Sequence, residues 1–430
     1  MYAKNECFKR QNNACLMAEA IFYSNMHLCK ICNEAIVPIC SFGQMPIANG
    51  FLTEAQFESE YFFELAVGFC EHCKTFQLLY TPDNRQLFHD HYVFCTSGSQ
   101  TMVRHFERMA SDYKTVWLAC KQDPFVVELG SNDGSMLRHL AADGIRHLGV
   151  EPSTNVAAIS NRYGVCTKNC LFDHQTAAEI ASEYGKADLI SCSNVHFLDM
   201  NSTAKGIASL LKRDGMFVFE DPYLGNLIQN VAYDQIYDEH AYIFSLNSIK
   251  SIFEPVGMEI FHIEQYPTYG GSMRYFIGFK GEHQINGRCL EQWEQENHLL
   301  KLDCLETYQQ FAKHCVQRKQ ETIQLLTGLK KQGKRIVGYG APAKSTIVLN
   351  YCNIGCDILD CIYDTTPIKQ GKFSPGKHIP IRAFTKNWFQ GVDDALLFIW
   401  NHKQEVLEKE IAFKQKGGQW VVLTPTVCVL

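Results

Sequence analysis

The feature that most restricts the fold of this chain is a buried strand that runs directly into a glycine-rich turn and then a helix. Residues 125–129 form an apolar run with one glutamate, and Gly130 and Gly134 frame the turn that follows. Ser135 then opens a segment with apolar residues at helical spacing. This order is typical of the nucleotide-binding turn in a doubly wound α/β sheet. Strand and helix patterns alternate over residues 101–281, which predicts a parallel sheet with crossover helices.

The residues of the turn favour S-adenosylmethionine over a dinucleotide as the cofactor. The pattern is Glu-x-Gly-x-Asn-x-Gly, with Glu128, Gly130, Asn132 and Gly134, in place of Gly-x-Gly-x-x-Gly. A carboxylate here would repel a pyrophosphate but is compatible with a cationic sulfonium. The next strand ends in Glu151, which can accept hydrogen bonds from both ribose hydroxyls. The alternative is an ordinary βα turn with an incidental glutamate at the strand end.

Further polar residues follow the later strands. The strand expected over residues 187–192 is followed by Asn194 and His196. Because ligands of such sheets bind outside the carboxyl ends of the strands, both should face the active crevice, with Asn194 at the cofactor. A strand at 216–219 precedes Tyr-Asp-Glu-His at 237–240. Histidine can act as a general base, and Tyr and His can donate to a developing oxyanion. A solvated loop is an equally weighted alternative for this segment.

Two Cys-x-x-Cys pairs near the N-terminus predict a zinc site. Two such pairs can complete a tetrahedral set of four thiolates, here Cys29, Cys32, Cys70 and Cys73. Because four protein ligands leave no open position, the metal would be structural. The alternative is four unrelated thiols. The chain has 19 cysteines, an odd and scattered set that indicates a reducing compartment and not a disulfide scaffold.

Length and charge limit the remaining possibilities. A chain of 430 residues is too long for one ordinary core, so two or three domains are expected. A net charge of −6 and an isoelectric point near 6.2 argue against a nucleic-acid partner. The sequence has no run of about 18 apolar residues that could span a membrane. We therefore expect a cytoplasmic protein without nucleic-acid or membrane partners.

A second strand and glycine turn follow a long helical pattern at residues 290–331. The strand opens at residue 335, and Gly338 and Gly340 form the turn. Together with Lys344, this turn could cradle a diphosphate. An empty structural turn is nearly as well supported by the sequence.

Taken together, the motifs resemble the C-methyltransferases that act on nucleotide-linked deoxysugars and place a branch methyl at C3 of a 4-keto-6-deoxy hexose. The resemblance extends from about residue 27 to the C-terminus. Its motifs are the two Cys-x-x-Cys pairs, Glu-Leu-Gly-Ser-Asn-Asp-Gly at 128–134, Phe-Glu-Asp-Pro-Tyr-Leu-Gly at 219–225, Tyr-Asp-Gln-Ile-Tyr-Asp-Glu-His at 233–240, Gly-Gly-Ser-Met-Arg at 270–274, Gly-Tyr-Gly-Ala-Pro-Ala-Lys at 338–344, Tyr-Asp-Thr-Thr-Pro at 363–367 and Pro-Gly-Lys-His-Ile-Pro at 375–380.

The resemblance implies roles for individual residues. It makes His240 the base that removes the C3 proton. The oxygen at C4, which becomes an enolate, would accept hydrogen bonds from Tyr237 and His196. Glu239 would orient His240 or hold a sugar hydroxyl. Substrate contacts are expected from four further residues: Tyr92, Tyr223, Arg274 and Lys344.

The resemblance also implies an α/β chain with three domains, in which a central Rossmann-like methyltransferase domain lies between a zinc-binding domain and a second Rossmann-like domain. We expect an extension at 1–25, a zinc-binding and substrate-lid domain at 26–100, the methyltransferase domain at 101–285, and a helical linker with a nucleotide-sugar-binding domain at 286–430. The implied partner is a nucleotide-linked keto-deoxysugar, with TDP as the expected nucleotide. The alternatives are an O- or N-methyltransferase acting on another small metabolite and a catalytically silent zinc and nucleotide-sugar binding protein.

Overall fold

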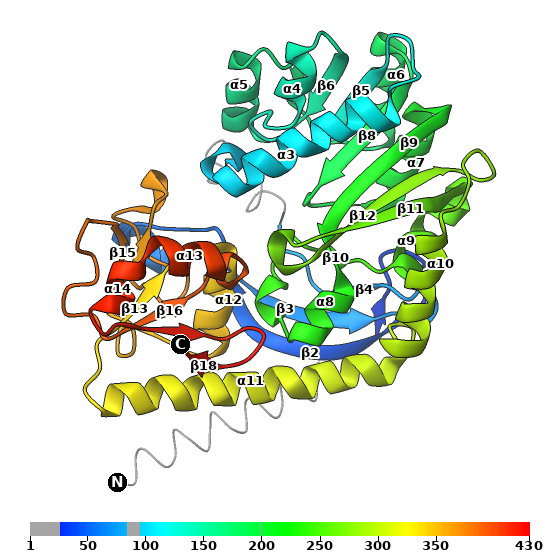
Figure 1. Cartoon of the computed structure of the whole chain (residues 1–430). Coiled ribbons are helices and arrows are strands. Elements are labelled where there is room, and N and C mark those ends of the chain that lie inside the picture. The colour runs from blue at the N-terminus through cyan, green and yellow to red at the C-terminus, as the bar shows by residue number, and fades with distance from the viewer. Residues whose placement is uncertain (1–25, 84–94, 198) are drawn as a thin grey trace.

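The computed structural model describes residues 26–83, 95–197 and 199–430, so the predicted extension at 1–25 lies outside the described residues. The N-terminal part forms an antiparallel sheet (Figure 1). Its strands are, in spatial order, β1 (His27–Leu28), β2 (Ala35–Pro46), β3 (Phe62–Phe69), β4 (Phe76–Leu78) and β10 (Tyr242–Ile243). The last of these comes from much later in the chain, so the sheet is completed by the segment that follows Tyr-Asp-Glu-His.

The middle sheet has seven strands and carries the first glycine turn. The spatial order of its strands is β11 (Met258–Tyr266), β12 (Ser272–Phe279), β9 (Leu211–Pro222), β8 (Ala187–Ser193), β5 (Phe125–Leu129), β6 (Arg146–Val150) and β7 (Thr167–Lys168). All strands from β5 to β9 are parallel, and β12 is antiparallel to both of its neighbours. Because β6 and β8 lie on opposite sides of β5, the chain reverses its winding there, which is where such sheets bind ligands.

Helices connect and cover this middle sheet (Figure 1). They are α3 (Gln100–Asp112), α4 (Leu137–Ala142), α5 (Thr154–Arg162), α6 (His174–Tyr184), α7 (Met200–Leu210), α9 (Leu246–Phe253) and α10 (Gly287–Glu294). The short helix α8 (Leu224–Asn230) instead lies beside the N-terminal sheet (Figure 1), and its Leu224 and Leu227 pack into the core of that part. The predicted Rossmann-like α/β fold is confirmed.

The C-terminal part begins with α11 (Leu305–Lys331), a helix of 27 residues that runs along the edge of the molecule (Figure 1). A six-stranded sheet follows, in the order β15 (Ile381–Ala383), β14 (Ile362–Asp364), β13 (Ile336–Tyr339), β16 (Asp394–Leu397), β17 (Gln419–Val422) and β18 (Cys428–Val429). Only β18 is antiparallel to its neighbour. The helices of this part are α12 (Ala343–Tyr351), α13 (Lys403–Lys409) and α14 (Ile411–Gln415).

The N-terminal sheet and the C-terminal part share one hydrophobic core. Phe69 of β3 stacks on Tyr308 of α11, with ring centroids 4.0 Å apart. Phe42 of β2 meets the edge of Tyr351 of α12 at 5.1 Å. The core of the N-terminal sheet is therefore continuous with that of the C-terminal part. Among the described residues, no helix combines the length and apolarity needed to cross a bilayer.

Candidate active site

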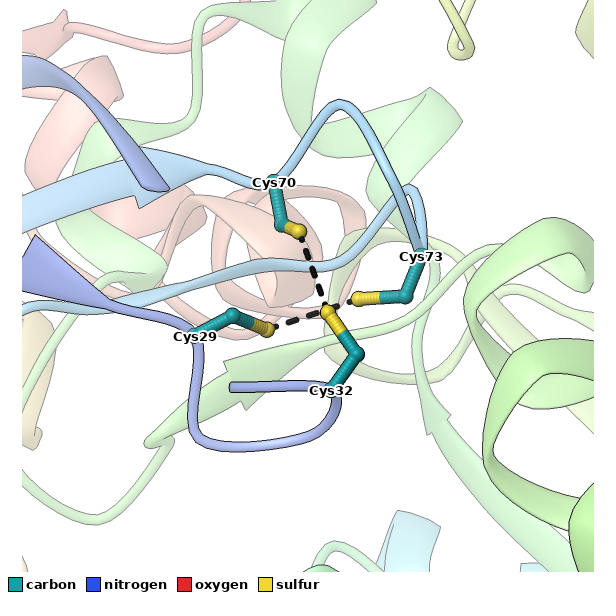
Figure 2. A group of neighbouring side chains, drawn as sticks. All are labelled: Cys29, Cys32, Cys70 and Cys73. Atoms are coloured by element: carbon teal, nitrogen blue, oxygen red, sulfur yellow. Dashed lines mark hydrogen bonds between the residues drawn. The ribbon is translucent and has the colours of Figure 1, made fainter. Parts of the chain in front are cut away.

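The four cysteines of the two Cys-x-x-Cys pairs converge from two turns of the N-terminal sheet, the one between β1 and β2 and the one between β3 and β4 (Figure 2). Their sulfur atoms all lie within 4.8 Å of one another. The Sγ atoms of Cys29 and Cys73 are 3.4 Å apart, and those of Cys32 and Cys70 are 3.5 Å apart. A regular tetrahedron with zinc–sulfur bonds of about 2.3 Å has sulfur atoms roughly 3.8 Å apart, so this cluster fits a zinc ion closely.

Local turns aim these sulfur atoms inward. One pair precedes β2, and the other joins β3 to β4. Each knuckle is closed by a backbone hydrogen bond, from Asn33 N to Cys29 O at 2.9 Å and from Lys74 N to Cys70 O at 2.9 Å. The amide of Gln77, on β4, also donates to Cys29 Sγ over 3.1 Å. Such an outer contact orients a thiolate ligand, as expected at a structural metal site.

A cavity of about 1030 Å³ lies where the carboxyl ends of the two parallel sheets meet. The turns after β5 and β13 both line it, together with the ends of β6, β8 and β14. The segment at 237–240 and Asn49 contribute the wall between the two sheets. Its volume is at the upper end of the range for small-molecule pockets, about 300–1,000 Å³, and suits a cofactor and a substrate together.

The end of the cavity at the middle sheet is acidic and contains buried polar atoms without partners. Glu128 Oε2, Ser131 Oγ and Asn194 Oδ1 are buried without a hydrogen bond, and all three residues line the cavity. Burial raises the pKa of Glu128 well above its usual value, and the nearby Asp133 and Glu151 raise it further. An unpaired buried carboxylate of this kind suits a cationic ligand, as the sulfonium and amino groups of S-adenosylmethionine require.

Backbone amides hold the second acidic group of this end in place. Glu151 accepts hydrogen bonds from Asn132 N (2.9 Å) and Ser153 N (2.8 Å), one at each carboxylate oxygen. Each oxygen keeps a further lone pair, so the carboxylate can still bind ribose hydroxyls. The side chain of Asn132 accepts a hydrogen bond from Thr96 N at 3.1 Å and so fastens the segment before α3 to the turn.

The two glycines of the turn have different surroundings. Gly130 has a φ of +65°, and a Cβ there would lie 2.3 Å from Cγ2 of Val195. It lines the cavity. Gly134, also predicted to bind cofactor, does not line the cavity, and a Cβ there would meet Ser160 Oγ at 2.7 Å. The absence of a side chain at Gly134 lets the turn pack closely against α5.

The Tyr-Asp-Glu-His segment is not a solvated loop: Asp238 and His240 are buried, and Tyr237 and Glu239 are half-buried. Tyr237 and Glu239 line the cavity, and the Tyr237 hydroxyl lies 2.9 Å from Nε2 of His240, which is set behind it. His196 also lines the cavity, and its Nδ1 donates to the Glu239 carbonyl over 2.8 Å.

The protonation states of this segment follow from its burial. Burial lowers the pKa of His240 to about 3, and the charges of His196 and Lys344 act in the same direction. Burial also lowers the pKa of His196. The pKa of the Tyr237 hydroxyl is raised well above its usual value by burial and then by Glu239. At neutral pH the site therefore holds two neutral imidazoles and a protonated phenol.

The opposite end of the cavity is lined by three lysines, Lys344, Lys369 and Lys409, and by the acidic residues Asp364 and Glu405. Lys344 begins α12, donates to Asn401 Oδ1 over 3.0 Å and lies 4.8 Å above the ring of Trp400. Burial lowers its pKa to about 8, against the effect of Asp234, so it remains largely a cation at pH 7. Lys369 donates to the Ala341 carbonyl of the second glycine turn over 2.9 Å.

Two residues predicted to contact substrate lie elsewhere. The Tyr223 hydroxyl donates to Glu296 Oε1 over 2.9 Å inside the core. The Arg274 guanidinium forms an ion pair with Glu220 at 2.7 Å, because the antiparallel register of β9 and β12 sets these residues opposite each other. Neither lines the cavity, so both act as internal structural residues. The third, Tyr92, lies outside the described residues.

The cavity also contains residues that the sequence reasoning missed. Asn49, Tyr269 and Lys369 all line it. Tyr269 has a left-handed backbone with a φ of +54°, and its carbonyl accepts a hydrogen bond from Gln235. A left-handed tyrosine is unusual, and such strain is often found at functional sites. Of these three residues, only Tyr269 has a local signal in the sequence, the pair of glycines that follows it.

Comparison with known proteins agrees with this geometry. Three family models match, described as a zinc binding domain (residues 29–88), a methyltransferase domain (102–263) and a C-methyltransferase C-terminal domain (267–425). The chain is 30% identical over 403 residues to the C-methyltransferase NovU of Streptomyces niveus, across 92% of this chain and 95% of that protein.

Solved structures match the methyltransferase fold more distantly. A SAM-dependent methyltransferase of Anabaena variabilis is 16% identical, with a TM-score of 0.33 over 40% of this chain and 84% of that one. The magnesium protoporphyrin IX methyltransferase of Synechocystis, with bound SAH, is 16% identical, with a TM-score of 0.32 over 42% of this chain and 87% of that one. The family models and the cysteine cluster confirm the predicted cofactors, S-adenosylmethionine and zinc. The chain belongs to the S-adenosylmethionine-dependent C-methyltransferases that carry an N-terminal zinc binding domain.

Proposed function

We propose that this C-methyltransferase transfers a methyl group to C3 of a nucleotide-linked 4-keto-6-deoxy sugar, with TDP as the nucleotide, through an enolate. The observation that carries this proposal is that one cavity joins a carboxylate-lined end at the middle sheet to an end at the C-terminal sheet where lysines stand beside Asp364 and Glu405. The end with Glu128 and Glu151 suits a cationic cofactor. The end with Lys344 and Lys369, at the start of α12, suits the diphosphate of a sugar nucleotide.

The groups between these two ends suit removal of a proton beside a ketone. S-adenosylmethionine, held by Glu128, Glu151 and Asn194, would supply the methyl group. A carbon next to a carbonyl becomes nucleophilic only after it loses a proton. His240 is neutral, and its Nε2 lies 2.9 Å from the hydroxyl of Tyr237; in our proposal the ring carries its proton on Nδ1, so that Nε2 accepts from the phenol. The base predicted from the sequence is therefore in a form that can take a proton.

Tyr237 and His240 can address two neighbouring atoms of the sugar at once. In our proposal the Tyr237 hydroxyl turns from His240 to the C4 oxygen, and this leaves the Nε2 lone pair of His240 facing the hydrogen at C3. Such a placed donor is commonly worth ~3 kcal/mol as negative charge develops. The enolate charge also favours the imidazolium that His240 becomes, which opposes the effect of burial on its pKa.

His196 and Glu239 take supporting roles in this scheme. The sequence assigns His196 as a second donor to the C4 oxygen. Its Nδ1 proton is already used by the Glu239 carbonyl, and Nε2 of a neutral ring is an acceptor. We therefore assign His196 to holding the segment in place. The Glu239 carboxylate lines the cavity and is placed to bind a sugar hydroxyl.

A deuterium-exchange assay tests this function. The protein is incubated in D₂O with a TDP-4-keto-6-deoxy hexose, with and without S-adenosylmethionine, and the sugar is read by mass spectrometry. We expect exchange at C3 without cofactor and a methyl gain with it. Exchange should be lost in His240→Ala and slowed in Tyr237→Phe. Tyr163→Phe, at an exposed tyrosine, is the matched control and should leave both rates unchanged.

Three outcomes would contradict parts of the proposal. Absence of both exchange and methyl gain across several such sugars would remove the substrate assignment. Methyl transfer that is insensitive to Tyr237→Phe would instead favour an oxygen or nitrogen acceptor, because such an acceptor needs no enolate. Loss of exchange in His196→Asn but not in His240→Ala would move the base to His196.

A further inference from the structure

The turn that follows β2 enters the active site from the N-terminal sheet. It spans residues 47–50 and is closed by a hydrogen bond from Gly50 N to Ile47 O at 3.0 Å. Ala48, at its tip, is fully buried, with 0% of its surface exposed. Its backbone N–H donates to Asp238 Oδ1 over 2.9 Å, and its carbonyl accepts from Thr346 Oγ1 over 2.8 Å. The backbone of Ala48, just after the N-terminal sheet strand β2, thus forms hydrogen bonds with both the catalytic segment and α12.

The next residue of the turn reaches a catalytic side chain directly. Asn49 Nδ2 donates to Glu239 Oε1 over 2.9 Å. Both side chains line the cavity. A hydrogen bond to a carboxylate is stronger than one between neutral groups, and it fixes the direction of the acceptor as well as its position. Asn49 therefore contributes directly to the orientation of the Glu239 carboxylate.

The N-terminal sheet also holds the other end of the catalytic segment. Leu78 N, at the end of β4, donates to the Ala241 carbonyl over 2.8 Å. Tyr242 and Ile243 then pair with β4 as strand β10. Residues 237–243 are therefore held on one side by the turn after β2 and on the other by β4.

We propose that the turn at residues 47–50 positions the catalytic segment, and that Asn49 is the positioning residue for the Glu239 carboxylate. Asn49 need not touch the reacting atoms, since it acts through Glu239. This inference rests on the proposed function for its kinetic consequence. Its structural consequence, that the turn restrains residues 237–243, is independent of the substrate.

The structural consequence is tested by hydrogen exchange of the full-length, zinc-loaded protein, read by mass spectrometry. Asn49→Ala should speed amide exchange in peptides that cover residues 237–243 and leave peptides of β5 and β6 unchanged. The matched control is Gln44→Ala. It removes a similar amide-to-carboxylate bond, from Gln44 to Glu64 at 2.9 Å, on strand β2 just before the turn but at the exposed surface. Equal exchange of residues 237–243 in both variants would overturn the restraint.

The kinetic consequence is tested by C3 exchange in a double-mutant cycle. Asn49→Ala should lower kcat by about 10- to 100-fold, as expected for a lost hydrogen bond to a charged group, while the Kd of S-adenosylmethionine stays within about twofold. In a Glu239→Gln background, Asn49→Ala should cause little further loss, because its effect passes through that carboxylate. Asn49→Asp, which keeps the size but repels Glu239, should lose at least as much.

The failures of the two proposals are distinguishable. Wild-type protein that shows no C3 exchange would contradict the proposed substrate, and the hydrogen-exchange comparison would still decide whether the turn restrains the segment. Wild-type exchange with unchanged kcat in Asn49→Ala, or losses that simply multiply in the double variant, would overturn the role of Asn49.

Discussion

At the scale of single residues, Glu128 links cofactor binding to pH. Burial raises its pKa well above the usual value of 4.5, so the free enzyme keeps a proton there at a pH where an exposed glutamate would be ionised. A cationic cofactor favours the charged carboxylate and lowers this pKa. Binding should therefore release a proton, and the affinity for S-adenosylmethionine should rise with pH from about pH 4.5 until the raised pKa is passed.

Calorimetry in buffers of different ionisation enthalpy measures this released proton. Glu128→Gln should abolish the release and flatten the dependence of affinity on pH. A wild-type affinity that is constant across the same window would show that Glu128 is ionised before the cofactor arrives.

Lys344 provides a second prediction at this scale. If it binds the diphosphate of the substrate, Lys344→Met should raise the KM for the sugar nucleotide about tenfold or more and leave the Kd of S-adenosylmethionine unchanged, since the cofactor end of the cavity is separate. Lys313→Met, at an exposed lysine of α11, is the control. Steady-state kinetics with both ligands varied gives the two constants. An equal loss of affinity for both ligands would indicate a general disturbance of the cavity.

At the scale of elements, the turn between β5 and α4 can be tested through its first glycine. Gly130→Ala introduces a Cβ at a φ of +65° and within 2.3 Å of Val195 Cγ2. Gly144→Ala, after α4, has a similar φ of +71° but open space around the new atom. The control should lose about 1–2 kcal/mol of unfolding free energy from backbone strain alone. Gly130→Ala should lose more and should also weaken S-adenosylmethionine binding.

Urea unfolding and cofactor titration measure these two effects. The loss of unfolding free energy caused by Gly130→Ala should be smaller when it is measured in a Val195→Ala background, because the new Cβ no longer overlaps Val195. The loss that comes from the positive φ should remain. Equal stability of Gly130→Ala and Gly144→Ala would mean that Val195 moves aside without cost.

The elements also show which parts of the structure a sequence can predict. The strand, turn and helix at residues 125–142 were predictable because their signal is local: an apolar run, two glycines and a helical period. The contact between Asn49 and Glu239 was not, because no local pattern indicates which residues meet across 190 positions. Arg274 and Tyr223 were assigned to substrate from motifs, and a motif does not say which face of a strand its side chains occupy.

At the scale of the whole molecule, the cavity is assembled by all three sheets. The middle sheet contributes the acidic end, the C-terminal sheet the lysines, and the N-terminal sheet the turn that reaches the catalytic segment. The shared core of the N-terminal and C-terminal parts fixes these contributions relative to one another. The N-terminal sheet is thus a wall of the active site, a role that the predicted lid did not include.

This arrangement predicts that the zinc site affects catalysis through the N-terminal sheet. Gln77 of β4 donates to Cys29 Sγ. The same residue pairs with Tyr242 of β10, and Tyr242 comes two residues after His240 in the chain. A metal that holds the cysteines together therefore also holds β4, and β4 holds the end of the catalytic segment. Because thiolate–zinc bonds contribute directly to folding, their loss should loosen this sheet first.

Cys32→Ser should accordingly lower the zinc content, speed amide exchange in β4 and β10, and reduce the rate of C3 exchange, while the cofactor turn after β5 stays protected. Cys120→Ser, at an exposed cysteine, is the control and should behave as wild type. Metal analysis, hydrogen exchange and the deuterium assay read the three effects in one set of samples. Zinc loss with unchanged exchange in β10 would separate the metal from the active site. Zinc loss with equal loosening of β5 would show that the metal stabilises the whole chain and not this sheet in particular.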